Sequence, residues 1–230
     1  MQDPAPAFTR LLNILADLRT QCPWDRAQTF ESLRPNTIEE AYELSESILA
    51  DDKAGMKEEL GDLLLHIAFY ARMAWEDEDF DLAAVCHAVS DKLVRRHPHI
   101  YGETQANNEQ AVKQNWEQIK QQEQKNKGTL DGLPASLPAL IKAARLQEKA
   151  SGVGFDWDNQ GQVWEKVKEE LSEFETKARS QNPIDQEGLK AEFGDLLFSL
   201  VNYARFLQID PDNALEQTNQ KFEKRFREVE

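Results

Sequence analysis

Hydrophobic residues recur along the chain at the three- and four-residue spacing of an α-helix, not in the alternation of a strand. In the first such segment, Leu11, Leu12, Leu15 and Leu18 share one helix face. The same pattern predicts helices over residues 8–20, 37–50, 56–76, 82–96, 109–125, 137–150, 163–179, 185–207 and 211–229. No segment alternates as a strand would, so we expect an all-α protein built from helical bundles.

One long stretch of the sequence occurs twice. EELGDLLLHIAFYAR at 58–72 returns as AEFGDLLFSLVNYAR at 191–205. Other landmarks recur in the same order: Trp24-Asp25 with Trp157-Asp158, the acidic run 39–43 with 169–173, and Lys92 and Arg96 with Lys221 and Arg225. A polar stretch that becomes rich in glycine and proline separates the copies. We therefore predict two tandem duplicated helical domains, 7–126 and 137–230, joined by a linker at 127–136.

Composition and charge limit the possible partners. The chain has 230 residues, of which 40% are hydrophobic and 30% charged, which is typical of a globular protein. Its formal net charge of -15 argues against nucleic acid and anionic membranes as partners. A small anionic substrate remains possible, because a bound cation inverts the local charge. The two cysteines, Cys22 and Cys86, and the absence of a signal-peptide pattern favour a cytoplasmic location.

Two pairs of acidic residues in the first copy have the spacing of neighbours on one helix face. Glu40 and Glu43 are three residues apart, as are Glu59 and Asp62. If the two helices pack antiparallel, four carboxylates converge, and a cation relieves their repulsion. A ligand set made only of oxygen suits Mg²⁺ or Mn²⁺ and not zinc. The second copy repeats the set as Glu170, Glu173, Glu192 and Asp195.

Structural explanations compete with a metal site at these positions. An acidic helix face is commonly just solvated, and Glu40 would complete a capping box if Thr37 capped its helix. Neither explanation covers Asp62 and Asp195, which each lie between a glycine and a Leu-Leu pair inside an apolar run. We expect the leucine pairs to lie in the bundle core, where an unpaired carboxylate is unfavourable. We expect the glycines to leave room beside the carboxylates.

Two pairs of basic residues offer contacts to a phosphate chain. Lys92 and Arg96 are four residues apart and so share a helix face, and Lys221 and Arg225 repeat this spacing. Each pair could bind phosphate groups. Each pair could equally complement the dipole at the end of its helix.

Aromatic residues and histidines have less specific roles. Trp24, Phe155 and Trp157 lie in predicted turns, where they could stack on a nucleobase or anchor the core. His97 and His99 flank Pro98, which is expected to end a helix. We do not expect these histidines to bind a metal.

The motifs together resemble those of a known enzyme family. Glu40-x-x-Glu43 followed by Glu59-x-x-Asp62 resembles the signature of the all-α nucleoside triphosphate pyrophosphohydrolases. The segments CPWD, KLVRRHPHIYG, WEQIK, GFDW, FGDLLF and KFEKRFREVE are similar to those of the MazG family. The resemblance covers nearly the whole chain and both copies.

The resemblance implies an Mg²⁺-dependent homodimer that hydrolyses nucleoside triphosphates to monophosphate and pyrophosphate, as housekeeping of the nucleotide pool. Water activated by the metal would attack the α-phosphate. The implied metal ligands are Glu170, Glu173, Glu192 and Asp195 in the second copy and Glu40, Glu43, Glu59 and Asp62 in the first. Lys221 and Arg225 would bind phosphates, as would Lys92 and Arg96. A ligating carboxylate, or the adjacent Glu39 or Glu169, would accept the proton.

Both copies carry a full carboxylate set, and we expect the second copy to be the more active one. Lys166 lies one turn before Glu170 on the same helix face, where the first copy has Asn36. The second copy also pairs Phe155 with Trp157. The first copy would then serve in scaffolding, dimerisation or regulation. Family members commonly continue past the final basic helix, and such an extension would close over the nucleotide.

Three alternatives remain open on the sequence alone. A helical interaction module without activity would use its acidic faces only for solubility. A di-iron carboxylate bundle would need Glu-x-x-His motifs, whereas this chain places aspartate there. A relative acting on deoxyuridine triphosphate or phosphoribosyl-ATP would share the fold and metal site, and would differ in its base and sugar contacts.

Overall fold

The computed structural model describes residues 3–102, 128–179 and 185–230, together with the single positions 104, 108, 112, 115, 116, 119 and 123. Among these residues no strand occurs, which confirms the all-α class. The helices are α1 (Ala5–Gln21), α2 (Pro23–Arg26), α3 (Phe30–Leu49), α4 (Lys53–Glu76), α5 (Leu82–Arg96), α6 (Pro98–Tyr101), α8 (Ala139–Ser151), α9 (Gln160–Arg179), α10 (Gln186–Phe206) and α11 (Pro211–Arg227). The helix predicted over 109–125 lies mostly outside the described residues.

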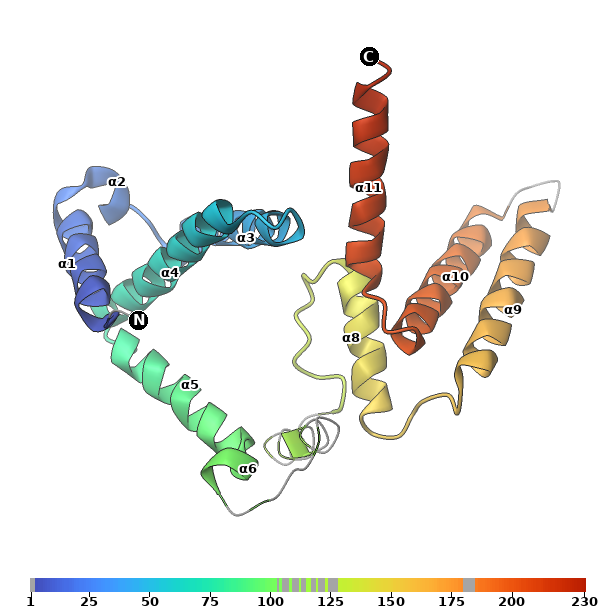
Figure 1. Ribbon diagram of the computed structural model, residues 1–230, viewed down its shortest axis with the longest axis horizontal. Coiled ribbons are helices and arrows are strands. Elements are labelled where there is room, and N and C mark those ends of the chain that lie inside the picture. The colour runs from blue at the N-terminus through green and yellow to red at the C-terminus, as the bar shows by residue number, and fades with distance from the viewer. Residues whose placement is uncertain are drawn as a thin grey trace. The chain divides into compact units, whose positions relative to one another are not determined.

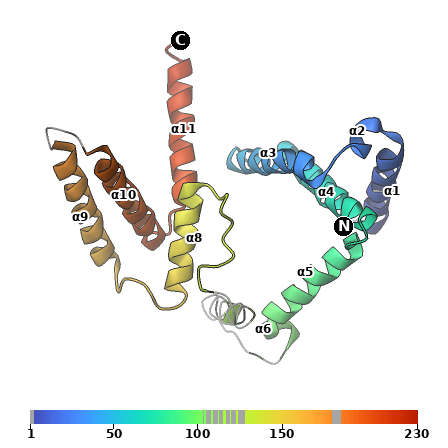
Figure 2. The ribbon, with the colours of Figure 1, turned by 180° about the vertical axis from the view of Figure 1, so that it is seen from behind.

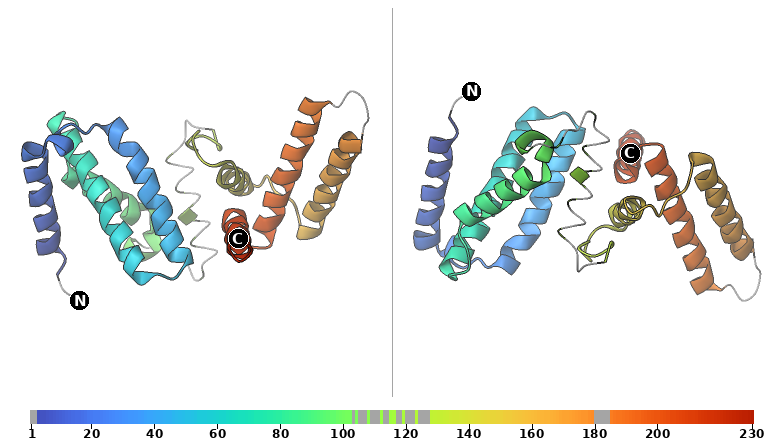
Figure 3. Two further views of the ribbon diagram at one scale, coloured as in Figure 1. Left: turned by 90° about the horizontal axis from the view of Figure 1, so that it is seen from above. Right: turned by 90° about the horizontal axis from the view of Figure 1, so that it is seen from below.

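The chain divides into two compact units, Met1–Gln105 (unit 1) and Ala106–Glu230 (unit 2). In unit 1, α3 and α4 form a hairpin, and α1 and α5 pack against α4 (Figure 1). In unit 2, α9 and α10 lie side by side in the same way, and α8 and α11 pack against α10 (Figures 2 and 3). This shared order of contacts confirms two tandem helical domains. The predicted limits 7–126 and 137–230 stay a prediction, because residues 103–127 are mostly outside the described part.

Most of the long helices begin at a residue whose side chain caps the free backbone N–H groups of the first turn. The capping residues are Thr29 for α3, Asp52 for α4, Asp81 for α5, Asp185 for α10 and Asp210 for α11. These polar residues fix where each amphipathic segment enters its bundle. The connection between α3 and α4 consequently needs only residues 50–52.

The helix that carries Glu40 begins earlier than predicted. The expectation that Thr37 caps it is wrong, because α3 starts at Phe30 and Thr29 forms the capping box with Ser32. Pro35 lies within the helix, where its missing N–H leaves only one backbone carbonyl without its helical partner. Glu40 therefore lies in the middle of α3, and capping does not explain it.

The buried apolar residues form a larger core in unit 1 than in unit 2. In unit 1, the core residues are Leu15, Leu33, Ala68, Phe69 and Met73, which come from α1, α3 and α4. In unit 2, the buried apolar residues of the α9–α10 hairpin are Val163, Val167 and Val201. In each unit, these buried residues therefore hold the helices of the hairpin together.

The repeated Leu-Leu pairs do not lie in these cores as expected. Leu64 is 40% exposed and Leu197 is 41% exposed, while Leu63 and Leu196 are half-buried. Asp62 is half-buried and Asp195 is exposed, so neither aspartate is enclosed by its own unit. The reason is that the core of each hairpin lies further along α4 and α10, at residues 66–74 and 199–201. None of the described helices has the length and apolar character to cross a membrane.

Candidate metal and nucleotide site

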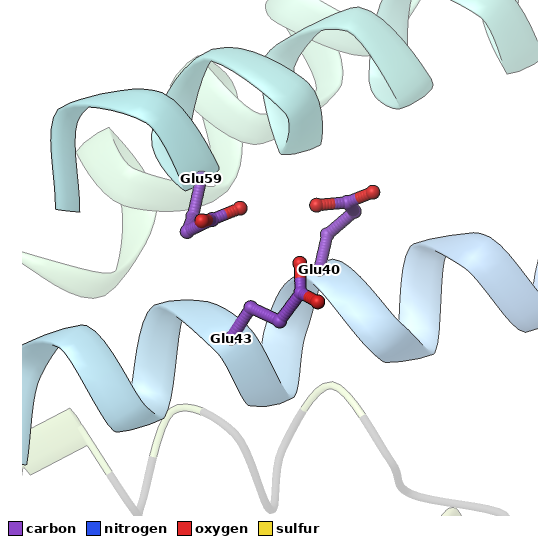
Figure 4. Close-up of side chains that lie close together, drawn as sticks. All are labelled: Glu40, Glu43 and Glu59. Atoms are coloured by element: carbon purple, nitrogen blue, oxygen red, sulfur yellow. The ribbon is translucent and has the colours of Figure 1, made fainter. Parts of the chain in front are cut away.

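The α3–α4 hairpin of unit 1 brings three carboxylates together. Oxygen atoms of Glu40, Glu43 and Glu59 all lie within 4.8 Å of one another. Figure 4 shows Glu40 and Glu43 rising from α3 towards Glu59, which descends from α4. This arrangement needs both the three-residue spacing on α3 and the antiparallel packing of α4. The structure thus gathers residues that are far apart in the sequence into one acidic cluster.

The electrostatics of this cluster are unfavourable in the absence of a cation. Burial, a hydrogen bond with Glu59, and repulsion by Asp62, Glu43 and Glu59 raise the pKa of Glu40 to about 7. Among the described residues, no ion pair neutralises Glu40, Glu43, Glu59 or Asp62. A divalent cation would remove the repulsion that raises this pKa. The donor set, composed only of carboxylate oxygens, fits a hard cation.

The α9–α10 hairpin of unit 2 gathers a second acidic cluster, and here lysines are already present. Oxygen atoms of Glu170, Glu192 and Asp195 lie within 4.8 Å of one another. Lys166 Nζ is 2.7 Å from Glu170 Oε1, and Lys177 Nζ is 2.8 Å from Glu192 Oε1. Glu170 is only 7% exposed, so its charge needs this compensation more than the exposed Asp195 does.

Lys166 is shared between two carboxylates. Its Nζ also lies 2.8 Å from Glu169 Oε1. The hydrogen bonds to Glu169 and Glu170 raise the pKa of Lys166 above its usual value. A hydrogen bond to Glu192 likewise raises the pKa of Lys177. Both amines are therefore charged at neutral pH, and both lie at the acidic cluster of unit 2.

Each cluster leaves out one of the four predicted carboxylates. Asp62 lies outside the close group in unit 1, although its charge contributes to the raised pKa of Glu40. Glu173 lies outside the close group in unit 2 and is exposed, while its charge contributes to the raised pKa of Lys177. The two clusters are thus similar in composition and differ in which residue is peripheral.

The predicted phosphate-binding pairs are not part of these clusters. Lys92 and Arg96 lie on α5, and Lys221 and Arg225 lie on α11, which packs against α8 and α10. Among the described residues, no ion pair joins Lys92, Lys221 or Arg225 to either cluster. Their role as phosphate ligands stays a prediction.

The predicted aromatic residues are exposed to different degrees. Trp24 in α2 is 58% exposed, and Phe155 and Trp157 are 82% and 44% exposed. Phe155 and Trp157 line a cavity in unit 2, so they are available to a ligand. His97 has its Nδ1 2.7 Å from the Leu93 carbonyl oxygen and follows the last residue of α5, in agreement with a structural role.

Gly61 and Gly194 do not serve close packing within the chain. A Cβ atom at either position would meet no described atom within 4 Å. The space beside both acidic clusters is thus open in each unit, as expected from the sequence.

Sequence reasoning missed several residues around unit 2. It did not identify Lys177, whose partner Glu192 comes from another helix. It also did not identify Gln147, or the ion pair of Arg205 with Asp156. A position-by-position comparison of the two copies could have indicated Asn202, because the first copy has Phe69 there.

The helical fold and its two acidic hairpins place the protein among the all-α nucleotide pyrophosphohydrolases, a class of enzymes. The family pattern of the MazG nucleotide pyrophosphohydrolase domain matches the sequence twice, at residues 28–101 and 160–229. Each match contains one of the two hairpins. The chain therefore belongs to the MazG family.

Individual relatives show the same likeness over nearly the whole chain. A protein of Escherichia coli K12 named nucleoside triphosphate pyrophosphohydrolase is 47% identical over 227 residues, which cover 96% of this chain and 86% of the relative. A Thermotoga maritima protein named nucleoside triphosphate pyrophosphohydrolase/pyrophosphatase MazG is 43% identical over 234 residues, covering 100% of this chain and 88% of the relative. Both acidic clusters lie within the shared length.

Proposed function

We propose that the protein hydrolyses nucleoside triphosphates to nucleoside monophosphate and pyrophosphate, with Mg²⁺ as its cofactor and with Mn²⁺ as a substitute. The observation that supports this most is the acidic cluster, which occurs once in each α-hairpin and consists only of carboxylates. The names of the relatives from Escherichia coli and Thermotoga maritima support the substrate class. The housekeeping role in the nucleotide pool follows from that activity.

The carboxylates fit a divalent cation. In unit 2, Glu170, Glu192 and Asp195 would hold it, with Glu173 at the edge of the set. In unit 1, the cation would be held by Glu40, Glu43 and Glu59, with Asp62 nearby. The raised pKa of Glu40 supports the fit, because burial raises it first and repulsion by the neighbouring carboxylates, which no ion pair among the described residues balances, raises it further. When bound, the cation would neutralise phosphate oxygens and lower the pKa of a water ligand.

We propose unit 2 as the principal catalytic unit. Lys166 and Lys177 lie at its acidic cluster, each 2.8 Å or less from a carboxylate. A lysine in this position can exchange its carboxylate partner for a phosphate oxygen of the substrate. The described ion pairs of unit 1 place no lysine at its cluster. Unit 1 would then act in scaffolding, dimerisation or regulation.

The remaining residues have distinct roles in this proposal. Glu169 is more than half exposed and is held next to the cluster by Lys166. It is therefore available to accept the proton of the attacking water, whose target is the α-phosphate. Lys221 and Arg225 would bind the terminal phosphates, and Lys92 and Arg96 would be their counterparts in unit 1.

We further propose a homodimer located in the cytoplasm. Leu60, Leu64 and Ile67 form an exposed apolar stripe on α4, with exposures of 53%, 40% and 49%. The repeat places Phe193, Leu197 and Leu200 in the same way on α10. A second copy of the chain would cover such stripes, which would explain why Leu64 and Leu197 are exposed in one chain. Sedimentation equilibrium should give twice the chain mass of 26.4 kDa, and a monomer mass would contradict this.

Product analysis tests the proposed activity. The purified protein is incubated with ATP, GTP, CTP or UTP and Mg²⁺, and the products are separated by anion-exchange chromatography. Monophosphate and pyrophosphate in equal amounts are the expected result, and chelation of the metal should stop their formation. Diphosphate with phosphate, or no turnover of any nucleotide, would contradict the proposal.

A further inference from the structure

Unit 2 contains a cavity between α8, the segment that follows it, and α10. Its volume is about 590 Å³, within the range of small-molecule sites. The walls are mainly apolar and include Leu146, Ala150 and Phe198. Phe155 and Trp157 also line it, and both are exposed enough to contact a ligand. Apolar walls with aromatic rings suit a flat heterocycle.

Gln147 places an unsatisfied hydrogen-bond acceptor in this cavity. The side chain is only 7% exposed, and its Nε2 donates to the Phe198 carbonyl oxygen at 2.8 Å. Its Oε1 is buried and has no hydrogen-bond partner within the described part of the chain. A buried acceptor without a partner is unfavourable, and a donor on a bound ligand would satisfy it.

Asn202 supplies a matching donor. Its Oδ1 accepts hydrogen bonds from Arg205 Nε at 3.1 Å and from Arg205 Nη2 at 2.9 Å. Since these bonds fix the orientation of the amide, Nδ2 is left as a donor, and no partner for it occurs among the described residues. Gln147 and Asn202 both line the cavity, which thus offers one acceptor and one donor. Every nucleobase carries a donor and an acceptor on its hydrogen-bonding edge.

The charged residues at the cavity neutralise each other. Arg205 Nη1 lies 2.9 Å from Asp156 Oδ2, and the two side chains form an ion pair. Burial raises the pKa of Asp156, but the hydrogen bonds from Arg205, Ser151 and the Trp157 backbone, with the charge of Arg205, together lower it below its usual value. The pair is therefore charged on both sides at neutral pH and adds no net charge. A neutral cavity suits a base better than it suits a phosphate.

The cavity lies in line with the acidic cluster of unit 2. Asp195 and Asn202 are seven residues apart on α10, which is almost two helical turns. The two residues therefore share one face of the helix and are separated by about 10 Å along its axis. A ligand with its phosphates at the acidic cluster would have its base directed along α10 towards the cavity.

Unit 1 shows what the same position looks like when it is closed. The repeat aligns Asn202 with Phe69, which is 3% exposed and belongs to the core of unit 1. The cavity between α1 and α4 is about 250 Å³. The replacement of a large apolar ring by a small amide thus accompanies a larger cavity in unit 2.

We infer that this cavity is the base subsite of unit 2, in which Gln147 Oε1 accepts a hydrogen bond from the base and Asn202 Nδ2 donates one. The inference rests on the proposed triphosphate hydrolysis and adds the residues that select the base. Phe155 and Trp157 stack on the ring at the rim. Unit 1, with Phe69 in the corresponding position, does not accept a base there.

Steady-state kinetics of pyrophosphate release test this subsite. Wild type, Asn202→Phe and Gln147→Leu are compared with ATP, GTP, CTP and UTP, and inorganic tripolyphosphate serves as a competitive inhibitor without a base. Asn202→Phe should raise KM at least tenfold for all four nucleotides and leave the tripolyphosphate inhibition constant within twofold. Gln147→Leu should raise KM by factors that differ at least threefold between bases, because the lost acceptor faces a different donor on each base. Gln186→Leu, an exposed position on α10, is the control and should match wild type.

The outcomes separate the subsite from the activity. If wild type forms no pyrophosphate, the proposed function itself fails. If wild type is active and folded Asn202→Phe keeps its KM for every nucleotide, the subsite is wrong. If Asn202→Phe does not fold in a thermal melt, Gln147→Leu decides alone, and an equal KM change for all bases or none contradicts the inference. A tripolyphosphate constant that rises together with the nucleotide KM would assign Asn202 to the phosphate site and also overturn it.

Discussion

The two units have the same hairpin and nearly the same acidic residues, but they balance the negative charge differently. In unit 1, burial and the repulsion among the neighbouring carboxylates raise the pKa of Glu40 to about 7. In unit 2, Lys166 and Lys177 contact the corresponding carboxylates. Two sites that share a carboxylate signature can therefore differ in their electrostatics. Lysines that contact the carboxylates determine how much negative charge remains for a cation to neutralise.

The units also differ next to the hairpin. Phe69 closes the core of unit 1, whereas Asn202 opens on a cavity in unit 2. The ion pairs of Arg72 and of its counterpart Arg205 also differ. Arg72 pairs with Glu76 on its own helix, whereas Arg205 pairs with Asp156 outside its helix. Unit 1 thus uses this position for packing, and unit 2 uses it to line a cavity. This is the division expected of a scaffold and a catalytic unit.

Exchange of Phe69 should give the largest effect on stability. Phe69→Asn removes a buried ring and buries an amide without partners, so unit 1 should lose at least about 3 kcal/mol of unfolding free energy. Asn202→Ala in unit 2 removes only the hydrogen bonds to Arg205 and should cost about 1 kcal/mol. Hydrogen exchange of the amides in α4 and α10 measures both values. Equal losses in the two units would show that Phe69 does not stabilise the core of unit 1 more than Asn202 stabilises unit 2.

Removal of the lysine at the acidic cluster of unit 2 should give the next largest effect. Lys166→Met abolishes its contacts with Glu169 and Glu170 and should lower kcat/KM by about 10- to 100-fold, the loss expected for a charged hydrogen bond. Lys168→Met is the matched control, because Lys168 pairs with Glu165 on the same helix and does not contact the cluster. If both variants lose the same activity, the position of Lys166 at the cluster has no catalytic meaning.

The pH dependence of stability should distinguish the two clusters. The pKa of Glu40 is about 7 in the folded state and 4.5 as its reference value, so folding favours the protonated carboxyl. Its contribution to stability is full below pH about 4.5 and is lost as the pH rises through about 7. Without divalent cations, the melting temperature of unit 1 should fall by about 2–4 °C between pH 5 and pH 8.

Two additions to the thermal melts make this assignment specific. Glu40→Gln should remove the decline, because glutamine does not titrate. Saturating Mg²⁺ should also remove it, since the bound cation stabilises the ionised carboxylates. A decline that persists in Glu40→Gln would mean that another group causes it.

The repeated glycines should give the smallest effect. A Cβ atom at Gly61 or Gly194 meets nothing within 4 Å, so alanine should stabilise each helix by about 0.5–1 kcal/mol. Gly194→Ala should nevertheless reduce turnover if the open space beside Asp195 receives the substrate, whereas Gly61→Ala should not. Thermal melts and pyrophosphate release of both variants provide the comparison. Destabilisation by alanine at both positions would contradict the open space.

Much of the fold could be predicted because it depends on local patterns. The spacing of hydrophobic residues predicted the positions of α1 and α5 to within a few residues. The start of α3 was predicted wrongly, because the capping box of Thr29 with Ser32 fixes the first turn and Pro35 is accommodated after it. The exposure of Leu64 and Leu197 was also not predicted, since apolar character alone does not tell which face of a helix its own chain covers.

The site could be predicted only where spacing on one helix determines it. Glu40 with Glu43 could be paired from the sequence, because three residues always place neighbours on one face. Lys177 with Glu192 could not, because the two come from different helices. The cavity of unit 2 was missed for the same reason: Gln147 lies on α8 and Asn202 on α10, and only their packing brings them to one cavity.

The assignment of catalysis to unit 2 is tested most directly by comparing one carboxylate variant from each unit. Glu43→Ala and Glu173→Ala occupy corresponding positions in the two copies. We measure the rate of pyrophosphate formation from a nucleoside triphosphate with saturating Mg²⁺, after thermal melts show that both variants fold. We predict that Glu173→Ala loses activity on the order of 100-fold, while Glu43→Ala stays within about twofold of wild type. A larger loss in Glu43→Ala than in Glu173→Ala would contradict the assignment of catalysis to unit 2.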